Sequence, residues 1–197
     1  MQINIKVEGI ESALKKFDPQ IVQRAAVRAL NRAADSTKSN AIKTIRDKYN
    51  IKRNILADRM KVNKANKNKL ISELVVTGKR LGLFLYGARE IKKGVSVEVI
   101  KGQRKLLKGA FIKPWRSGEK ERWVFFRKKL GTSHQRRYKG KMRNVFRVGR
   151  VPREVLFGPS VPQLFGSRKV IEVILKYTTT YVKERFNHEL EYELNRK

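Results

Sequence analysis

The sequence predicts an α+β protein, in which N-terminal helices and a long C-terminal helix pack on a mainly antiparallel sheet. Two segments follow the helical spacing of apolar residues, one from about residue 18 to residue 48 and one from residue 167 to residue 197. Several short segments between them alternate apolar and polar residues, which is typical of half-buried strands. Because helices flank a group of strands and do not alternate with them, the pattern argues against a doubly wound parallel sheet.

The first strand and the first helix have clear local signals. Ile3, Ile5 and Val7 alternate with polar residues, so Gln2–Val7 is expected to be a strand. Asp18 precedes Pro19, and this pair marks a helix start because Asp caps helices and proline is tolerated in the first turn. The helix is expected to run to about Lys48, and its many alanines predict that a partner element approaches it closely.

Three arginines, Arg24, Arg28 and Arg32, lie four residues apart on the opposite face of this helix. Two interpretations stay open for them. The ridge is either a solvated face or a surface that faces an anion.

The rest of the chain is read in the same way. A short helix is expected at Ile51–Met60, and Ser167 is expected to cap the long C-terminal helix. The polar, basic segments Asn63–Lys69 and Gly131–Asn144 are the least regular stretches. The expected strands are Leu70–Thr77, Gly82–Tyr86, Gly94–Ile100, a pair formed by Leu106–Ile112 and Glu121–Arg127 around a turn at Pro114–Gly118, and short strands at Val145–Val148 and Val155–Phe157.

The length of 197 residues favours a single domain over residues 1–197. Its expected parts are 1–62, a strand with basic helices; 68–158, the sheet with a basic loop at 128–144; and 167–197, the C-terminal helix.

Charge is the most unusual property of the sequence. Lys and Arg number 48 against 17 Asp and Glu, for a net charge of +31. Residues 101–150 hold 18 basic and two acidic residues, so about half of the excess lies in a quarter of the chain. Such a surplus repels itself unless nucleic acid, acidic proteins or anionic lipid compensate it. Lipid ranks last, because the sequence lacks a membrane-seeking amphipathic stretch.

The catalytic and metal-binding motifs suggested by parts of the sequence are all incomplete. The chain has no cysteine and only two histidines, His134 and His188, so thiolate chemistry is excluded and a site with two His ligands would need both. Gly82–Gly87 has P-loop glycine spacing but lacks the Lys-Ser/Thr that must follow. Ser160 lies outside a Gly-x-Ser-x-Gly elbow and is expected in a turn.

Other classes are also disfavoured. Glu119 and Glu121 are the only carboxylates of residues 101–150, too few for the acidic cluster of a metal-dependent nuclease. No apolar run reaches the length of a membrane span, and the N-terminus does not resemble a secretory signal. We therefore expect no enzyme activity, no cofactor, no bound metal and no membrane partner.

The middle of the chain mixes aromatic and cationic residues. Cationic side chains neutralise phosphates with little sequence dependence. Trp123 and Phe125 are expected on one strand face, where a place in the core is favoured over a role in stacking on bases. Lys128–Arg143 is too charged to fold alone, and whether it is mobile or ordered by an anion stays open. The residues predicted to contact nucleic acid are Arg127, Lys128, Lys129, Arg136, Arg137, Lys139, Lys141 and Arg143.

Several segments, in order along nearly the whole chain, resemble one known family. They are the alanine-rich helix Ala25–Ala34, the basic segment Tyr49–Leu56, the hairpin elements Gly102–Lys105, Lys108–Ile112 and Trp123–Arg127, and the turn Gly158–Pro162 before the terminal helix. Together they resemble the phage minor tail protein Z family, the tail completion proteins of lambda-type phages. Lys108–Ile112, with Gly-Ala-Phe-Ile, and Gly158–Pro162, with Gly-Pro-Ser-Val, are its more specific motifs.

The resemblance implies a virion structural protein at the head-proximal end of a long tail, assembled in the host cytoplasm and completing the tail for head joining. The implied partners are tail and neck proteins such as the tube and the tail terminator, phage DNA in the lumen, and further copies in a homo-oligomeric ring. An alternative is a free-standing, non-specific nucleic-acid-binding protein of ribosomal or nucleoid type.

Overall fold

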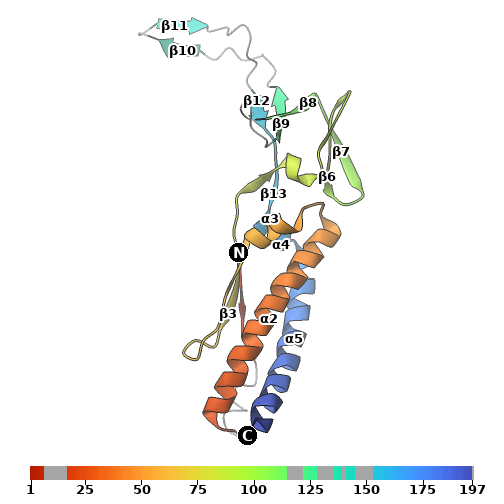
Figure 1. The fold of residues 1–197 in the computed structure, drawn as a ribbon. Helices are drawn as coiled ribbons and strands as arrows, with labels where there is room; N and C mark the ends of the chain where they lie inside the picture. The colour runs from red at the N-terminus through yellow and green to blue at the C-terminus, as the bar shows by residue number, and fades with distance from the viewer. Residues whose placement is uncertain (7–16, 115–121, 128–134, 139–140, 145–152, 197) are drawn as a thin grey trace. The chain divides into compact units, whose positions relative to one another are not determined.

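The structure is a computed structural model that describes residues 1–6, 17–114, 122–127, 135–138, 141–144 and 153–196 (Figure 1). The chain divides into two compact units: the first comprises Met1–Arg80 and Pro159–Lys197, and the second, Leu81–Gly158, is inserted between these two stretches. The predicted α+β class is confirmed, with the strands distributed over several small antiparallel sheets. That the chain folds as one domain stays a prediction.

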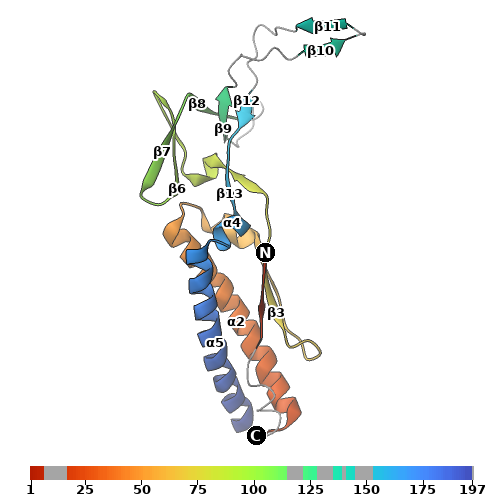
Figure 2. The same ribbon diagram turned by 180° about the vertical axis from the view of Figure 1, so that it is seen from behind.

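The first unit is built on a pair of long helices, α2 (Pro19–Lys48) and α5 (Arg168–Asn195), which lie side by side (Figure 1, Figure 2). As predicted, Asp18 caps α2, since its Oδ1 accepts the Gln20 N–H at 2.7 Å. The contact faces of α2 consist largely of small side chains, which allow close helix packing. The fully buried alanines are Ala25, Ala26, Ala29, Ala33, Ala34 and Ala41.

The helical spacing of apolar residues predicted for the C-terminal segment is confirmed in part on α5. Ile174, Thr178, Val182 and Phe186 are buried, Ile171, Leu190 and Leu194 are half-buried, and Leu175 is 44% exposed. At mid-length the buried stripe is polar, because the hydroxyls of Thr178 and Thr37 of α2 lie 3.1 Å apart and satisfy each other. The helix pair therefore combines close apolar packing with a directional contact.

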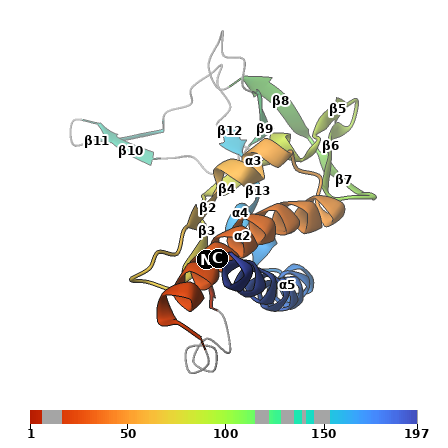
Figure 3. The same cartoon turned by 60° about the horizontal axis from the view of Figure 1, so that its bottom comes forward.

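A three-stranded antiparallel sheet packs on α2 in the order β1 (Gln2–Ile5), β3 (Ser72–Val76), β2 (Met60–Asn63). Figure 3 shows α2 beside both this sheet and α5. Leu74, at the centre of β3, is fully buried and stands opposite residues of both neighbouring strands.

The predicted short helix is shorter than expected. It is α3 (Arg53–Asp58), and Met60 is the first residue of β2 rather than the last helical one. The reason is pairing with β3: Met60 stands opposite Val76 and is buried there, so the core contact predicted for a helical residue is made from a strand.

Ser160 was expected in a turn, and that expectation is wrong. It ends β13 (Phe157–Ser160) and caps α4 (Val161–Phe165). Its Oγ accepts the Gln163 N–H, and the Gln163 side chain accepts the Ser160 N–H at 2.8 Å, which is a capping box. Ser167 stands at the predicted start of α5, but its hydroxyl donates to the Leu164 carbonyl instead of capping the helix.

The second unit contains two three-stranded sheets. Their orders are β5 (Arg89–Ile91), β6 (Gly94–Ile100), β7 (Gln103–Lys108), and β12 (Arg153–Val155), β9 (Arg122–Arg127), β8 (Ala110–Pro114). The strand predicted at Leu106–Ile112 is divided at Gly109, whose φ of +75° turns the chain. As a result only its second half pairs with β9, as predicted, while its first half pairs with β6.

The strand predicted at Gly82–Tyr86 is also wrong. β4 (Arg80–Gly82), which pairs with β13, gives way to a 3-10 turn, η1 (Leu83–Tyr86). In a 3-10 turn, residues three apart, here Leu83 and Tyr86, lie on the same side. Tyr86 is fully buried, and Gly87 ends the turn with its backbone in the left-handed region.

One aromatic residue of β9, Phe125, belongs to the core of the second unit, whereas Phe126 is 39% exposed. Phe125 is 2% exposed and stacks on Phe111 with ring centroids 5.8 Å apart, which confirms the core interpretation for Phe125. Trp123 is half-buried, and its ring meets Phe157 edge-on at 6.3 Å. The predicted strand Val145–Val148 and the residues of the turn after Pro114 lie outside the described residues.

Candidate nucleic-acid interface

The predicted nucleic-acid contacts fall only partly within the described residues. Lys128, Lys129 and Lys139 lie outside them. The other five lie on strands: Arg127 on β9, Arg136 and Arg137 on β10 (Gln135–Tyr138), and Lys141 and Arg143 on β11 (Lys141–Asn144).

Two paired strands occupy much of the segment Gly131–Asn144, which was expected to be a loop. β10 and β11 form a two-stranded antiparallel sheet. A sequence signal for them exists, because two residues, Lys139-Gly140, join the strands, and two-residue connections with glycine are typical of hairpins. The high density of cations obscured that signal.

Strand register brings arginines to directly opposed positions in two places. Arg136 stands opposite Arg143 in β10–β11, and Arg127 stands opposite Arg153 in β9–β12. Like charges at opposed positions destabilise a ladder. An anion shared by each pair would remove that penalty, and contact with nucleic acid at these positions stays a prediction. Sequence reasoning missed Arg153, because only the register reveals its partner.

The arginine ridge of α2 faces an anion supplied by the protein itself. Arg28 Nη1 donates to Glu193 Oε1, and Arg32 Nη1 donates to Glu189 Oε1. Arg24 Nε lies 3.8 Å from Glu193 Oε2. Both carboxylates project from α5 and their side chains are 2% exposed. The ridge therefore combines both interpretations: its arginines are partly exposed to solvent, and they pair with carboxylates of the same chain.

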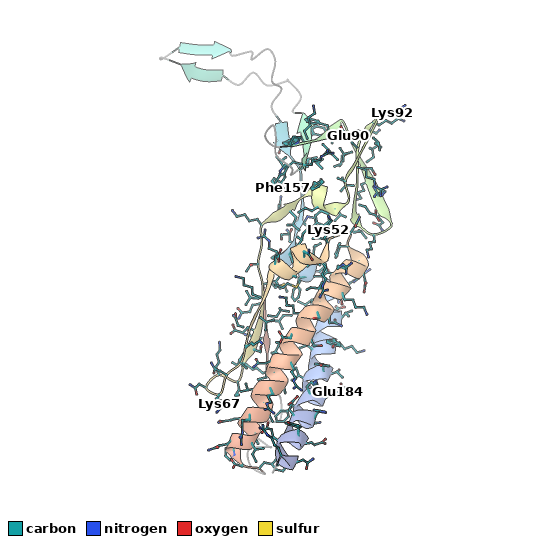
Figure 4. The ribbon with its side chains drawn as sticks, viewed as in Figure 1. Lys52, Lys67, Glu90, Lys92, Phe157 and Glu184 are labelled. Atoms are coloured by element: carbon teal, nitrogen blue, oxygen red, sulfur yellow. The ribbon has the colours of Figure 1, made fainter. Side chains whose placement is uncertain are left out.

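The basic segment Asn63–Lys69 is partly neutralised. Lys69 Nζ donates to Glu73 Oε1 at 2.9 Å, and the Asn63 amide donates to the other carboxylate oxygen at 3.1 Å. These two hydrogen bonds, that from Lys69 first, lower the pKa of Glu73. Lys67, by contrast, is exposed and extends away from the helices (Figure 4).

Replacing Lys69 with alanine is expected to raise the pKa of Glu73 toward its ordinary value, because the charged form loses its first hydrogen-bond donor. Since a lowered pKa contributes stability above the unfolded-state pKa and loses it as the pH falls, the variant should show a weaker loss of stability on acidification. Carboxyl NMR titration measures the shift. Lys67→Ala is the matched control, and an equal shift in both variants would contradict the assignment.

A second cationic group lies where α2, α3 and β2 follow one another. Its six side chains are exposed, and none forms an ion pair with another described residue. This group was not predicted from the sequence, because its members come from three different elements and lie close together only in the fold. Its members are Lys43, Arg46, Lys52, Arg53, Arg59 and Lys61.

Sites for other chemistry are not found in the part of the chain that the structure describes. There, no three His, Cys, Asp or Glu residues come together in a way that could hold a metal ion. His188 is exposed on α5, while His134, Glu119 and Glu121 lie outside the described ranges. Among the described helices, none combines the length and the apolar character needed to cross a membrane.

Comparison with known proteins gives a family match over nearly the whole chain. The model of the family described as prophage minor tail protein Z matches residues 7–197. No curated protein and no solved structure matches the chain.

Proposed function

Since this chain belongs to the prophage minor tail protein Z family, and so to the structural proteins of phage tails, we propose that it acts at the head-proximal end of a long tail. There it completes the tail for joining to the head and contacts DNA without reading its sequence. The family match over residues 7–197 is the observation that carries the tail role.

The DNA contact rests on charge and register. A net charge of +31 requires anionic neighbours, and a genome that reaches the tail lumen provides them. The opposed pairs Arg136/Arg143 and Arg127/Arg153 support a contact with the DNA backbone, since bound phosphates would relieve the repulsion between the two arginines of each pair. Contacts of this kind position a protein on DNA and do not specify a sequence.

A passive role agrees with the chemistry of the chain. The chain has no cysteine, so it has no thiolate nucleophile, and its two histidines, the residue type that most often acts as a general base, lie far apart in the sequence. We propose that it makes or breaks no covalent bond, and that its partners are tail and neck proteins such as the tube and the tail terminator, with further copies of itself in a ring.

Head joining is tested directly with particles. Tails assembled without this chain are mixed with the purified protein and then with filled heads, and joined particles are counted by electron microscopy. Recovery of joining is the expected result. Failure to restore joining, or absence of the chain from purified particles, would contradict the proposal and favour the free-standing nucleic-acid-binding alternative.

The DNA contact is tested by removing four cations from β10–β11. Arg136, Arg137, Lys141 and Arg143 are replaced together by alanine, and duplex DNA binding is measured by fluorescence anisotropy between low and moderate salt. The slope of log K against log salt should become shallower by about 3 to 4, because each phosphate that the protein neutralises contributes about 0.9 to that slope.

The matched control removes the same charge elsewhere. Lys43, Arg46, Lys52 and Arg53 are exposed and are replaced together by alanine. We expect the slope to change by less than about 1 in this control, because the proposal places the DNA contact on β10–β11 and not on these four positions. Equal changes of slope in the two variants would mean that DNA responds to net charge and not to the hairpin.

A further inference from the structure

We propose that the outer edge of β7 and the apolar groove beside it bind an extended, acidic segment of a neighbouring tail or neck protein, which adds a strand to the sheet β5–β6–β7. The proposal goes beyond the DNA contact, and it relies on the proposed function only for the identity of the neighbours. Four properties of the second unit carry it.

The first property is a groove with aliphatic walls. It has a volume of about 320 Å³, at the lower end of the range for binding pockets. Ile100, one of its walls, is 44% exposed, so the groove opens to solvent. The residues that line it are Leu83, Val97, Val99, Ile100, Gln103, Lys105 and Leu107.

The second property is the unpaired edge of β7. β7 is an outer strand of its sheet, and no strand among the described residues pairs with its far side. The Gly109 N–H donates to the Lys93 carbonyl, which identifies these opposed residues as a hydrogen-bonded pair. Because such pairs alternate along an antiparallel ladder, the backbone groups of Leu106 and Lys108 point away from β6. They are available to another strand.

The third property is the relation of the groove to that edge. Alternate residues of a strand project to the same face of the sheet. Lys105 and Leu107 of β7 both line the groove, so every second residue of a strand added beside β7 projects to the groove side. This is the geometry of peptide recognition by strand addition, in which backbone bonds give affinity and a groove selects side chains.

The fourth property is charge, which selects the occupant. Lys101, Lys105 and Lys108 are exposed and form no ion pair with a described residue, while Arg104 is paired with Glu98 at 3.1 Å. A partner that carries carboxylates is therefore favoured. A second copy of β7 would bring like charges together, which is a known means of preventing edge-to-edge association. Nucleic acid is disfavoured because the groove has no aromatic wall on which a base could stack.

Photo-crosslinking in assembled tails tests the proposal. Because the chain has no cysteine, Gln103→Cys creates a unique thiol at the groove, which is labelled with benzophenone maleimide before assembly. We expect a cross-link to a different tail or neck protein, within a segment that alternates acidic and apolar residues. Lys108→Cys is the matched control on the same strand outside the groove, and its yield should be at least fivefold lower.

Three results would overturn the inference: a cross-link to a second copy of this chain, a cross-link to DNA, or equal yields from the two positions. Normal head joining together with any of these overturns this inference and leaves the proposed function intact. Absence of the wild-type chain from particles would instead overturn the proposed function and, with it, this inference.

A charge reversal gives an independent readout. Lys105→Glu, in the groove, should lower the Gln103 cross-link yield at least tenfold, whereas Lys108→Glu should lower it less than threefold. Leu106→Pro removes an outward N–H from the edge and should abolish the cross-link, while Leu106→Ala keeps that N–H and should retain it. Circular dichroism confirms folding of each variant, and insensitivity to both Lys105→Glu and Leu106→Pro would overturn strand addition.

Discussion

Replacing Arg28 and Arg32 together with alanine is expected to lower the free energy of unfolding by about 2–4 kcal/mol. Both arginines pair with carboxylates of α5 that are 2% exposed. Removing one partner of a fully buried pair leaves an uncompensated charge, at a cost of about 3–5 kcal/mol. Glu189 loses its arginine partner in this way, whereas Glu193 keeps longer contacts with Arg24 at 3.8 Å and with Arg196 at 3.9 Å. The arginines are 39% and 54% exposed, so water screens part of that charge and the expected loss is smaller. Urea denaturation followed by circular dichroism measures it.

Two controls show whether the buried carboxylates cause the loss. Adding Glu189→Gln and Glu193→Gln removes the uncompensated charges, so the fourfold variant should recover at least half of the lost stability. Lys43→Ala with Arg46→Ala removes the same number of positive charges from exposed positions of α2 and should change stability by less than about 1 kcal/mol. A fourfold variant no more stable than the double variant would contradict this explanation.

Gly94→Ala is expected to destabilise the second unit by about 2–6 kcal/mol, since strain and overpacking each contribute about 1–3 kcal/mol. Gly94 has a φ of +145°, and a Cβ there would lie 2.1 Å from the carbonyl oxygen of Leu107. The obstacle is backbone on the neighbouring strand, so no side-chain movement relieves it. Hydrogen exchange of the β6 and β7 amides, together with urea denaturation, measures the effect.

Gly102 provides the control for backbone strain. It also has a positive φ, +78°, but no atom lies within 4 Å of a Cβ built there. Gly102→Ala should therefore cost only the left-handed penalty of about 1–2 kcal/mol. Similar losses in Gly94→Ala and Gly102→Ala would mean that the clash with Leu107 is relieved in the folded protein.

Elements with local signals were predictable from the sequence. The cap at Asp18 fixes the start of α2, and the alternating valines of Gly94–Ile100 give β6 with its observed bounds. Gly82–Tyr86 was misassigned because a short apolar run fits a strand or a helical turn equally well, and periodicity cannot separate them. The break at Gly109 was missed because a glycine within a strand pattern marks either a bulge or a turn.

The candidate site was less predictable because its key relations span long distances in the sequence. The carboxylate that meets Arg32 lies 157 residues away, so no local pattern identifies it. The opposition of Arg127 and Arg153 likewise depends on strand register. The composition of residues 101–150 predicted a basic region, but it could not separate the cations that stabilise the fold from those available to a partner.

The insertion of the second unit between the two stretches of the first has a consequence for biosynthesis. After Arg32 is incorporated, translation must add a further 157 residues before Glu189 exists, which takes roughly 8–30 s at typical elongation rates. During that interval the face of α2 that packs on α5 has no partner, and every residue of Leu81–Gly158 is synthesised before α5 begins. The nascent chain should therefore complete its inserted unit first, and α2 depends on chaperones or on its own solubility until α5 emerges.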